Sequence, residues 1–547
     1  MTKVIVLGGG IGGLTAAHEL VARGFEPHIY DTRNIPGGKS RTLPVPDSGT
    51  DGRRDLPGEH GFRFFPAFYV HLPDSMKRIP YGRGQSCFDN LVPTHHLELA
   101  QYDAAGIKGL TGLPESLDDV LLILKDLFGR GVGVPLDEIF FFAQRIWQVM
   151  TSCDERRLTE LEAQSWWDYV DAPNKSAGYQ KFLANGLSRS LVAAVPQEAS
   201  ARTIGQIQVR LIAGVATLST DRVLNGPTST VFLEPWIAEL KRLGARYHEL
   251  SHVTRINMQR GAIKSVAVRR RGATEVTEVD GDWFVSALPV ECLAPLLSDD
   301  LLRADPGLRS ILELQRNVRW MNGIQFFLKQ DAPIIDGHVL YVDSPWAITS
   351  ISEAQFWGGF PLSGYGDGTV KGVLSVDISD WNEAGTFVPK PACEASREEI
   401  AQEVWQELKR SLNVGGKQLL HDDMLHSYFL DSDIEIAPPG QPRPDINLEP
   451  LFINRPNTWT LRPPATSAIP NFVLAADFVQ TNTDLACMEA ANEAARRAVN
   501  AVLDATGSAA PRCRLWPMEM PPLLAHCRAL DSKRFARGLP WNGHCFL

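Results

Sequence analysis

A glycine-rich turn lies near the N-terminus, directly after the apolar run from Lys3 to Leu7. It has the spacing G-x-G-x-x-G and starts at Gly8. In such a turn the first glycine permits a tight bend, the second lets the backbone approach a pyrophosphate, and the third lets the following helix pack closely on the strand. The positive helix N-terminus then attracts the phosphates. The residues predicted to contact a dinucleotide here are Gly8, Gly10, Ile11, Gly12 and Gly13.

An acidic residue follows at the position where a dinucleotide fold binds ribose. After the glycines the sequence carries Leu14 and Leu20 on one helical stripe, breaks near Gly24, and continues into a second strand that ends at Asp31. A carboxylate there accepts hydrogen bonds from ribose hydroxyls, and its charge disfavours the 2′-phosphate of NADP. An ordinary strand-to-helix turn is the alternative interpretation. The predicted ribose contacts are Asp31 and Thr32.

Two further glycines and two basic residues occupy the sequence from Asp31 to Thr42. This pattern resembles the second signature of the FAD-dependent amine oxidase and phytoene (carotenoid) desaturase superfamily, which includes hydroxysqualene dehydroxylase-like flavoproteins. The resemblance implies FAD as the cofactor. Gly38 and the glycine before it would let the backbone close over the pyrophosphate, with positive charge from Lys39 and Arg41 beside it. The family more often has arginine where this chain has Lys39, and a solvated basic turn is the alternative interpretation.

A second match to the same family lies near the C-terminus. An apolar strand over residues 471–477 ends in Asp477, and an alanine-rich helix is predicted from Thr481 to Ala495. The resemblance implies that Asp477 binds the ribityl chain and that the backbone at Cys487 and Met488 faces the flavin pyrimidine. A helix N-terminus there would stabilise the negative charge of reduced flavin. A plain amphipathic surface helix, capped by Asp477, is the alternative.

The middle of the chain fits the same plan. A helix is predicted from Glu234 to Leu243, a strand from Tyr247 to Met258, and a buried strand from Trp283 to Leu288. The family resemblance implies that the strand near Val253 lays its backbone against adenine. The strand at Trp283 matches the family's return crossover, so the resemblance covers nearly the whole chain.

An unusual segment, residues 58–66, places an imidazole, charged groups and aromatic rings beside two glycines. Desaturase-like relatives place this stretch against the isoalloxazine ring, so we expect its polar groups to bind the ring or the substrate. The alternative is a structural ion pair between Glu59 and Arg63, with His60 capping a loop. The predicted flavin contacts are Gly58, His60 and Gly61, and the predicted catalytic residues are His60 and Arg63.

The predicted activity is dehydrogenation of a mostly apolar small molecule of the carotenoid or isoprenoid type, by hydride transfer to flavin N5. The flavin performs the difficult chemistry, while the protein supplies position, dryness and polarity. Desaturation of a C–C bond also needs a base for the second proton, and His60 is the best candidate. Amine oxidation and a non-redox, flavin-dependent polyene isomerisation are the alternatives. A binding protein with a vestigial nucleotide fold would instead purify without colour.

Two strongly apolar, helix-like stretches lie between Leu117 and Met150. They are typical of a cap over an apolar substrate tunnel, or of a patch that touches a membrane surface. The core of a second domain is an equally good interpretation. Peripheral membrane contact therefore remains one of the expectations.

The length of 547 residues favours two interleaved domains. We predict an α/β fold, in which a doubly wound, Rossmann-like FAD-binding domain alternates along the chain with an α+β substrate domain. The C-terminal tail after residue 507 is too rich in aromatic residues to be disordered. We expect it to pack on the rest of the chain, at a homodimer contact or elsewhere. The segments are 1–75, 225–300 and 465–507 for the FAD domain, 76–224 and 301–464 for the substrate domain, and 508–547 for the tail.

Composition excludes some partners. The chain has 54 Lys and Arg against 64 Asp and Glu, a net charge of −10, so it has no overall basic field for binding nucleic acid. Its eight cysteines are scattered, with no CxxC pair and no histidine at zinc-ligand spacing, so we predict reduced thiols and no metal site. The N-terminus has no export signal and the chain has no long apolar run, which predicts a cytoplasmic protein, with contact to the inner face of the membrane as an option.

Overall fold

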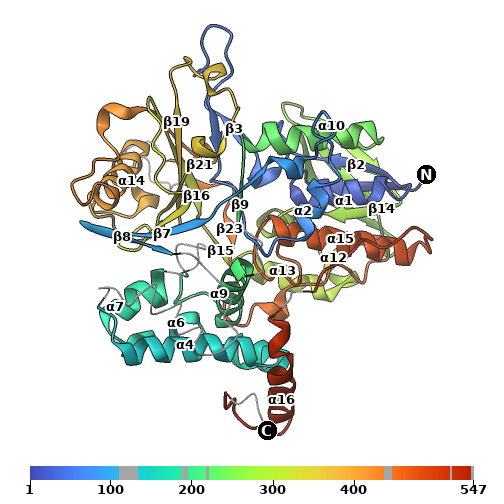
Figure 1. The fold of residues 1–547 in the computed structure, drawn as a ribbon. Coiled ribbons are helices and arrows are strands. Elements are labelled where there is room, and N and C mark those ends of the chain that lie inside the picture. Colours follow the sequence, from blue (N-terminus) through green and yellow to red (C-terminus); the bar gives the residue numbers. More distant parts are fainter. Residues whose placement is uncertain are drawn as a thin grey trace.

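Two large sheets, one of five strands and one of seven, organise the chain (Figure 1). A computed structural model describes residues 1–109, 133–186, 188, 195–216, 221–436, 446–517 and 520–543. The five-stranded sheet lies towards the N-terminus in the view of Figure 1, the seven-stranded sheet lies on the opposite side, and a helical lobe lies below both. In the described part of the chain, no helix combines the length and apolar character needed to span a bilayer.

The five-stranded sheet is entirely parallel. Its strand order is β10-β2-β1-β14-β24, so the N-terminal strand β1 is central. Because both faces of a parallel sheet are covered, β1 is a continuous apolar run in which Val4 to Leu7 are fully buried. All five strands lie within residues 1–75, 225–300 and 465–507. They are β1 (Lys3–Leu7), β2 (Glu26–Tyr30), β10 (Arg246–His248), β14 (Trp283–Ser286) and β24 (Phe472–Leu474).

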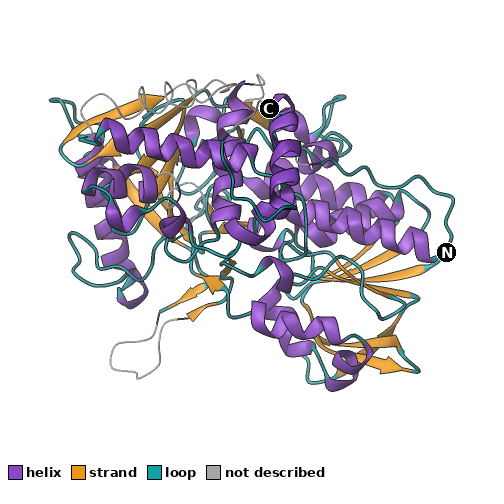
Figure 2. Ribbon diagram, turned by 90° about the horizontal axis from the view of Figure 1, so that it is seen from below, coloured by secondary structure: helices purple, strands orange, loops and turns teal. Residues whose placement is uncertain are grey.

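Helices cover one face of this sheet, and a small antiparallel sheet together with further short helices lies on the other (Figure 2). Helix α1 (Ile11–Val21) packs against α15 (Met488–Ala505) and α10 (Glu234–Arg242). The antiparallel sheet consists of β11 (Ser251–Gln259), β12 (Ala262–Arg270) and β13 (Val276–Asp280).

The predicted start of the last of these helices at Thr481 is wrong, because α15 begins only at Met488. The side chain of Glu493 accepts hydrogen bonds from the backbone N–H groups of Asn482 (2.7 Å) and Thr483 (3.1 Å). These donors are therefore satisfied outside a helix, and the segment before Met488 forms a turn instead.

The seven-stranded sheet is mixed, with order β20-β16-β19-β18-β17-β7-β8 and one parallel pair, β7 with β17, among its ladders. Helix α14 (Arg397–Leu412) packs on it and buries Ile400, Val404 and Leu408. A capping box between Ser396 and Glu399 starts this helix. The strands are β7 (His96–Gln101), β8 (Ala104–Gly109), β16 (Asn322–Leu328), β17 (Gly337–Tyr341), β18 (Thr349–Ser352), β19 (Gly372–Ile378) and β20 (Leu425–Leu430).

The helical lobe has its own core, built around Phe142, Trp166 and Tyr179. Helix α4 therefore packs its apolar side on this core, although Leu136 and Phe140 on its outer side are exposed. The first of the two predicted apolar stretches, around residues 121–128, lies outside the described residues. The helices of the lobe are α4 (Leu136–Thr151), α5 (Asp154–Arg156), α6 (Trp166–Tyr169), α7 (Ala177–Tyr179) and α9 (Ala201–Ala216).

The C-terminal segment packs on this lobe through α16 (Ala525–Phe535), which contacts α4 and α5. Both carboxylate oxygens of Asp531 bind the buried guanidinium of Arg156, at 2.9 and 3.1 Å. Cys527, on the same helix, is disulfide-bonded, so the prediction that all eight cysteines are reduced is wrong.

Short elements connect these units. The strands are β3 (Thr42–Pro44), β4 (Pro57–Glu59), β5 (Phe64–Phe65), β6 (Leu91–Pro93), β9 (Arg222–Leu224), β15 (Val318–Arg319), β21 (Ile434–Glu435), β22 (Ile446–Asn447) and β23 (Leu451–Phe452). The helices are α2 (His71–Met76), α11 (Val290–Leu293), α12 (Asp299–Ala304) and α13 (Arg309–Leu314).

Candidate functional site

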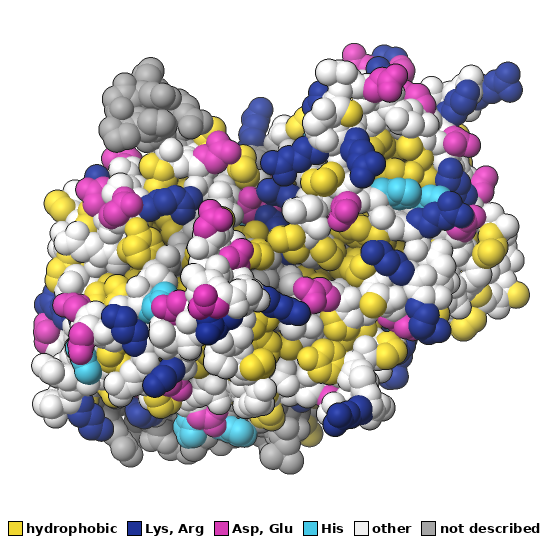
Figure 3. Space-filling view, turned by 90° about the horizontal axis from the view of Figure 1, so that it is seen from above, with side chains coloured by type: hydrophobic (Ala, Val, Ile, Leu, Met, Phe, Trp, Pro, Cys, Tyr) yellow, Lys and Arg dark blue, Asp and Glu magenta, His cyan; other side chains and the backbone are white. Residues whose placement is uncertain are grey.

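A cavity of about 460 Å³ lies where the two large sheets and the helical lobe meet. Its wall combines the turn between β1 and α1, the segment after β2, the loop over residues 60–69, and the connection from β24 to α15. Helix α9, three strands of the seven-stranded sheet, the start of β11 and the segments at residues 287–296 and 448–451 also line it. In the face seen in Figure 3, hydrophobic side chains gather near the middle, with charged side chains spread around them. Of the residues predicted to bind the cofactor, all but Gly13, Arg41 and Gly58 line this cavity.

The glycines of the first turn have different tasks. Gly8 has a positive φ of 98°. A Cβ atom on Gly12 would lie 2.0 Å from the Ala475 carbonyl oxygen, and one on Gly13 would lie 1.9 Å from the Gly8 carbonyl oxygen. These two glycines therefore allow close packing of α1. A Cβ on Gly10 would meet nothing closer than 3.8 Å, so the open space beside Gly10 belongs to the cavity.

Asp31 directly follows β2 and connects the glycine turn after β1 to the segment that begins at Arg33. Its Oδ2 accepts a hydrogen bond from the Gly9 backbone N–H at 2.5 Å, and its Oδ1 accepts one from the Arg33 N–H at 2.7 Å. Burial raises the pKa of Asp31, although these two bonds oppose the effect. Asp31 and Thr32 both line the cavity, where the carboxylate retains lone pairs for a ribose hydroxyl.

The two basic residues after the glycine pair separate in the structure. Lys39 lines the cavity, and its Nζ atom binds the Glu291 carboxylate at 2.8 Å. Arg41 is only 2% exposed and does not line the cavity. Its guanidinium instead binds both oxygens of Glu449, at 2.8 and 2.9 Å, and one oxygen of Asp433 at 2.5 Å. Lys39 can therefore contact a ligand directly, whereas Arg41 stabilises the wall behind it.

The C-terminal motif reaches the cavity from the opposite side. Asp477 lines the wall after β24, and burial raises the pKa of its carboxyl against the opposing charges of Lys39 and Arg462. Cys487 precedes the first residue of α15, and both Cys487 and Met488 line the cavity. Burial raises the pKa of the Cys487 thiol to about 12, so it is a neutral wall residue. The N-terminus of an 18-residue helix thus meets the cavity.

The segment over residues 58–66 packs against β16 of the seven-stranded sheet. The Gly323 backbone N–H donates to the His60 carbonyl oxygen at 2.7 Å, and a Cβ on Gly323 would lie 2.7 Å from the Gly61 Cα atom. A Cβ on Gly58 would lie 2.5 Å from the Phe429 ring, so Gly58 serves packing at this position. Gly323 therefore allows residues 60–61 to pack closely on β16, a role that its position in the sequence does not reveal.

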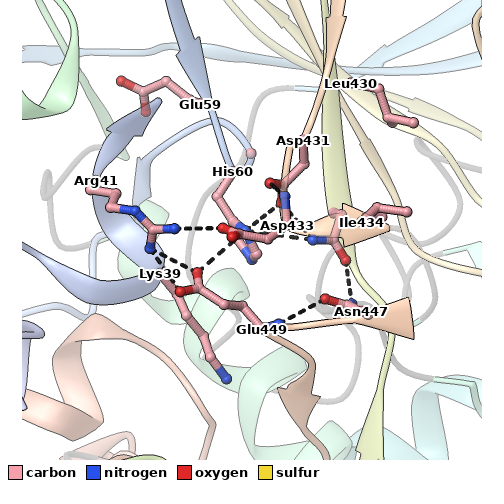
Figure 4. Close-up of polar contacts among 12 residues, drawn as sticks. Lys39, Arg41, Glu59, His60, Leu430, Asp431, Asp433, Ile434, Asn447 and Glu449 are labelled. Carbon is pink, nitrogen blue, oxygen red and sulfur yellow. Dashed lines mark hydrogen bonds and ion pairs between the residues drawn. The ribbon is translucent and has the colours of Figure 1, made fainter. Parts of the chain in front are cut away.

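His60 and Arg63 both line the cavity, but their polar atoms have different partners. The His60 Nδ1 atom lies 2.5 Å from an Asp431 carboxylate oxygen (Figure 4). Arg63 donates to the carbonyl oxygens of Gly61 (2.7 Å) and Lys39 (2.8 Å), so it joins two loops of the wall. The Arg63 Nε atom lies 3.9 Å from Glu59 Oε2, so the ion pair between Glu59 and Arg63 that the sequence offered as an alternative is present but long.

An acidic and basic network surrounds His60 (Figure 4). Ligand atoms of His60, Asp431 and Asp433 lie within 4.8 Å of one another, which is close enough for a metal ion. Arg41 and Arg33 already bind Asp433, at 2.5 and 3.0 Å. Because these guanidinium groups neutralise the carboxylate, we interpret the cluster as an ion-pair network and assign no metal to it.

Two cavity residues, Asp377 and His338, lie in no sequence motif that predicts a functional site. Asp377, on β19, is 7% exposed, and its Oδ1 atom has no hydrogen-bond partner among the described residues. Burial raises the pKa of Asp377 to about 7, although the charges of Arg63 and His60 oppose this. Nearby, burial lowers the pKa of His338 to about 4, and its ring centroid lies 4.4 Å from that of Phe64. Both side chains reach the cavity only because strands remote in sequence pair in one sheet.

The glycine turn, the acid at the end of β2 and the long helix that begins at the same cavity define the class of a dinucleotide-binding α/β protein. A family model described as flavin containing amine oxidoreductase matches residues 11–503. The chain belongs to this family and is an FAD-dependent oxidoreductase. The match confirms the resemblance inferred from the sequence.

Solved structures confirm the predicted α/β fold. Cyclohexylamine oxidase from Brevibacterium oxydans IH-35A is similar, with a TM-score of 0.61, 12% sequence identity, and coverage of 92% of this chain and 99% of that chain. An oxidoreductase from Methanosarcina mazei has a TM-score of 0.58, 13% identity, and coverage of 92% and 100%. At these identities the likeness concerns the fold alone.

A curated relative shares a shorter region. The 4,4′-diaponeurosporene oxygenase of Staphylococcus haemolyticus is 43% identical over 49 residues, which are 9% of this chain and 10% of that protein. The match thus spans about a tenth of the curated relative.

The residues present fit FAD. A Cβ on Gly10 would meet no protein atom closer than 3.8 Å, Asp31 and Asp477 line the same cavity, and the N-terminus of α15 meets it. Lys39 supplies a cation on the wall between them. We therefore expect the first glycine turn to hold the pyrophosphate and Asp477 with the start of α15 to hold the flavin end.

Proposed function

We propose that this chain uses its FAD to dehydrogenate a mostly apolar small molecule of the carotenoid or isoprenoid type. The observation that carries the proposal is the apolar wall of the cavity. Helix α9 contributes Ile207 and Leu211, and the loop after Gly61 contributes Phe62, Phe64 and Phe68. A hydrocarbon chain is recognised by such burial and needs few hydrogen bonds.

The chain's own groups divide the work. When bound, oxidised FAD supplies a hydride acceptor at flavin N5. The aromatic wall orients the substrate and excludes water, which disfavours side reactions. His60 accepts the second proton at Nε2, the ring nitrogen that is left for a ligand because Nδ1 is bound to Asp431. Arg63 holds the two loops of the wall together through backbone carbonyl oxygens.

Amine oxidation is the second candidate. The family description favours it, and so does the aromatic pair formed by Phe64 and the neutral His338 at one wall of the cavity. A neutral amine could bind there through its apolar body. A flavin-dependent polyene isomerase is a third candidate, which would act only when the flavin is already reduced.

The test is anaerobic mixing of the FAD-loaded protein with polyenes, triterpenes and amines, followed at the oxidised flavin band. We expect bleaching by a polyene or a triterpene. Bleaching by amines alone would favour amine oxidation. A flavin that stays oxidised with all three classes would contradict net dehydrogenation, and product isomers formed only after chemical reduction of the flavin would favour the isomerase.

The role of His60 has its own test. We expect His60→Ala to retain the FAD absorbance and to slow flavin reduction by about 10²-fold or more, because it removes the proton acceptor. The rate is measured by stopped-flow absorbance at saturating substrate. An unchanged rate would remove His60 from the chemistry and leave it a wall residue.

A further inference from the structure

His60 and Asp431 form a hydrogen-bonded pair beside the cavity (Figure 4). The Nδ1 atom of His60 lies 2.5 Å from Oδ2 of Asp431. Asp431 has no exposed surface, whereas His60 lines the cavity. The pair therefore joins a buried carboxylate to an imidazole that a ligand can reach.

The carboxylate of Asp431 is fixed in its orientation. Its Oδ2 also accepts a hydrogen bond from the Asn322 side-chain amide at 2.6 Å, and its Oδ1 accepts one from the Asp433 N–H at 2.9 Å. Asn322 is held in turn by the side-chain amide of Asn447 at 2.6 Å. Arg397 donates to the carbonyl oxygen of Asp431 at 3.2 Å and anchors the chain at that point. Both carboxylate oxygens are therefore committed to their present partners.

The charges around His60 single out Asp431 as its partner. Arg41 binds Asp433 and Glu449, and the nearest Glu449 oxygen lies 3.9 Å from His60 Nδ1. Burial would raise the pKa of Asp431, but the charge and hydrogen bond of His60 outweigh it and the pKa lies below its ordinary value. The titratable groups that face His60 are Asp377, Asp431, Asp433 and Glu449.

We propose that Asp431 is a positioning residue that holds the proton of His60 on Nδ1, directs Nε2 into the cavity, and stabilises the imidazolium. This inference rests on the proposed function, in which His60 accepts a proton from the substrate. In that step one substrate C–H bond breaks, and its hydrogen leaves with the electron pair as hydride for the flavin. The adjacent C–H bond gives its proton to Nε2 and its electron pair to the new double bond. The partner of one ring nitrogen sets the tautomer and leaves the other as the base.

Asp431→Asn in the full-length, FAD-loaded protein tests the proposal. We expect the FAD absorbance to be retained, flavin reduction at pH 7 to slow by about 10²-fold, and the pH profile of that rate to shift. Nitrogen-15 NMR of labelled histidine, assigned with His60→Gln, should show that the proton of the neutral His60 ring leaves Nδ1. A merely structural role for Asp431 would leave the proton on Nδ1.

Asp433→Asn is the matched control, because it makes the same change two residues away at a carboxylate bound by Arg41. It should leave the proton of His60 on Nδ1. Asp431→Glu should restore part of the rate. A wild-type His60 protonated at Nε2, or a proton that stays on Nδ1 in Asp431→Asn, would overturn the proposal. The wild-type measurement decides even when Asp431→Asn does not fold, and it is independent of the substrate, so failure of the proposed function is separately visible.

Discussion

On the side of the five-stranded sheet, backbone at glycine turns and at a helix N-terminus makes much of the cavity wall. On the side of the seven-stranded sheet, side chains from distant strands make it, among them Asp377 and His338. The first wall suits a large cofactor with phosphates, which backbone N–H groups recognise. The second suits a substrate whose identity depends on pocket shape and on a few polar groups. Variants that separate these two contributions test the comparison directly.

The largest expected effect concerns Gly10 on the cofactor side. We expect Gly10→Val to raise the Kd for FAD by about 10³-fold or more, which corresponds to at least about 4 kcal/mol, because the added side chain would occupy the space beside the pyrophosphate. The apoprotein should fold, since a Cβ at this position meets no protein atom closer than 3.8 Å. FAD titration of the apoprotein, with circular dichroism as a check on folding, measures both.

Gly358→Ala is the control for this variant, because a Cβ there meets nothing within 4 Å and the residue does not line the cavity. It should bind FAD normally. A yellow Gly10→Val protein with normal affinity would show that the first turn does not hold the cofactor.

The next effect concerns Asp377 on the substrate side. Its pKa is raised to about 7, so the unfolded chain ionises before the folded one as pH rises, and the folded state loses stability between about pH 4 and pH 7. Asp377→Asn removes this loss. Relative to wild type, the variant should gain up to about 4 kcal/mol as pH rises from 4 to 8, since each pKa unit corresponds to about 1.4 kcal/mol.

Urea unfolding of the two apoproteins at several pH values measures the difference. Subtracting the two curves cancels the titration of other groups. Parallel curves across this range would mean that Asp377 has an ordinary pKa and sits in a wetter environment than the structure indicates.

The sequence predicted the cofactor side far better than the substrate side. Gly8, Gly10 and Asp31 lie within a short stretch, and the order strand, turn, helix and strand determines where they meet. The physical requirements of a phosphate turn are local, so a local pattern was sufficient. The start of α15 was misplaced because Glu493, a residue inside that helix, binds the backbone of the preceding turn.

The substrate side could not be predicted in the same way. Asp377 belongs to the cavity because β19 pairs with β18 and β16, and Asp431 reaches His60 across a sequence separation of hundreds of residues. Only the pairing of strands brings these groups together. Sequence spacing likewise suggested that Lys39 and Arg41 act alike, whereas the fold turns one to the cavity and buries the other.

That difference predicts the third effect. Arg41→Met should lower the free energy of unfolding by about 3 kcal/mol, because it leaves the buried Asp433 and Glu449 carboxylates with less compensation. Lys39→Met should cost less stability and instead weaken FAD binding by about tenfold or more. Urea unfolding and FAD titration of each apoprotein separate the two. Equal losses of FAD affinity would show that Arg41 also contacts the cofactor.

The smallest effect concerns the outer surface of the helical lobe, where contact with a membrane remains an expectation. Leu136 and Phe140 are 60% and 56% exposed on α4 and lie one helical turn apart. Changing both to Ser should alter the free energy of unfolding by no more than about 0.5 kcal/mol, since neither side chain is buried. If the lobe inserts them between lipids, the same change should weaken binding to phosphatidylcholine–phosphatidylglycerol vesicles by about tenfold or more.

Val276→Ser, at an exposed residue of β13, is the control and should leave vesicle binding unchanged. If wild-type protein stays at the bottom of a flotation gradient while the vesicles rise, this surface does not bind membranes.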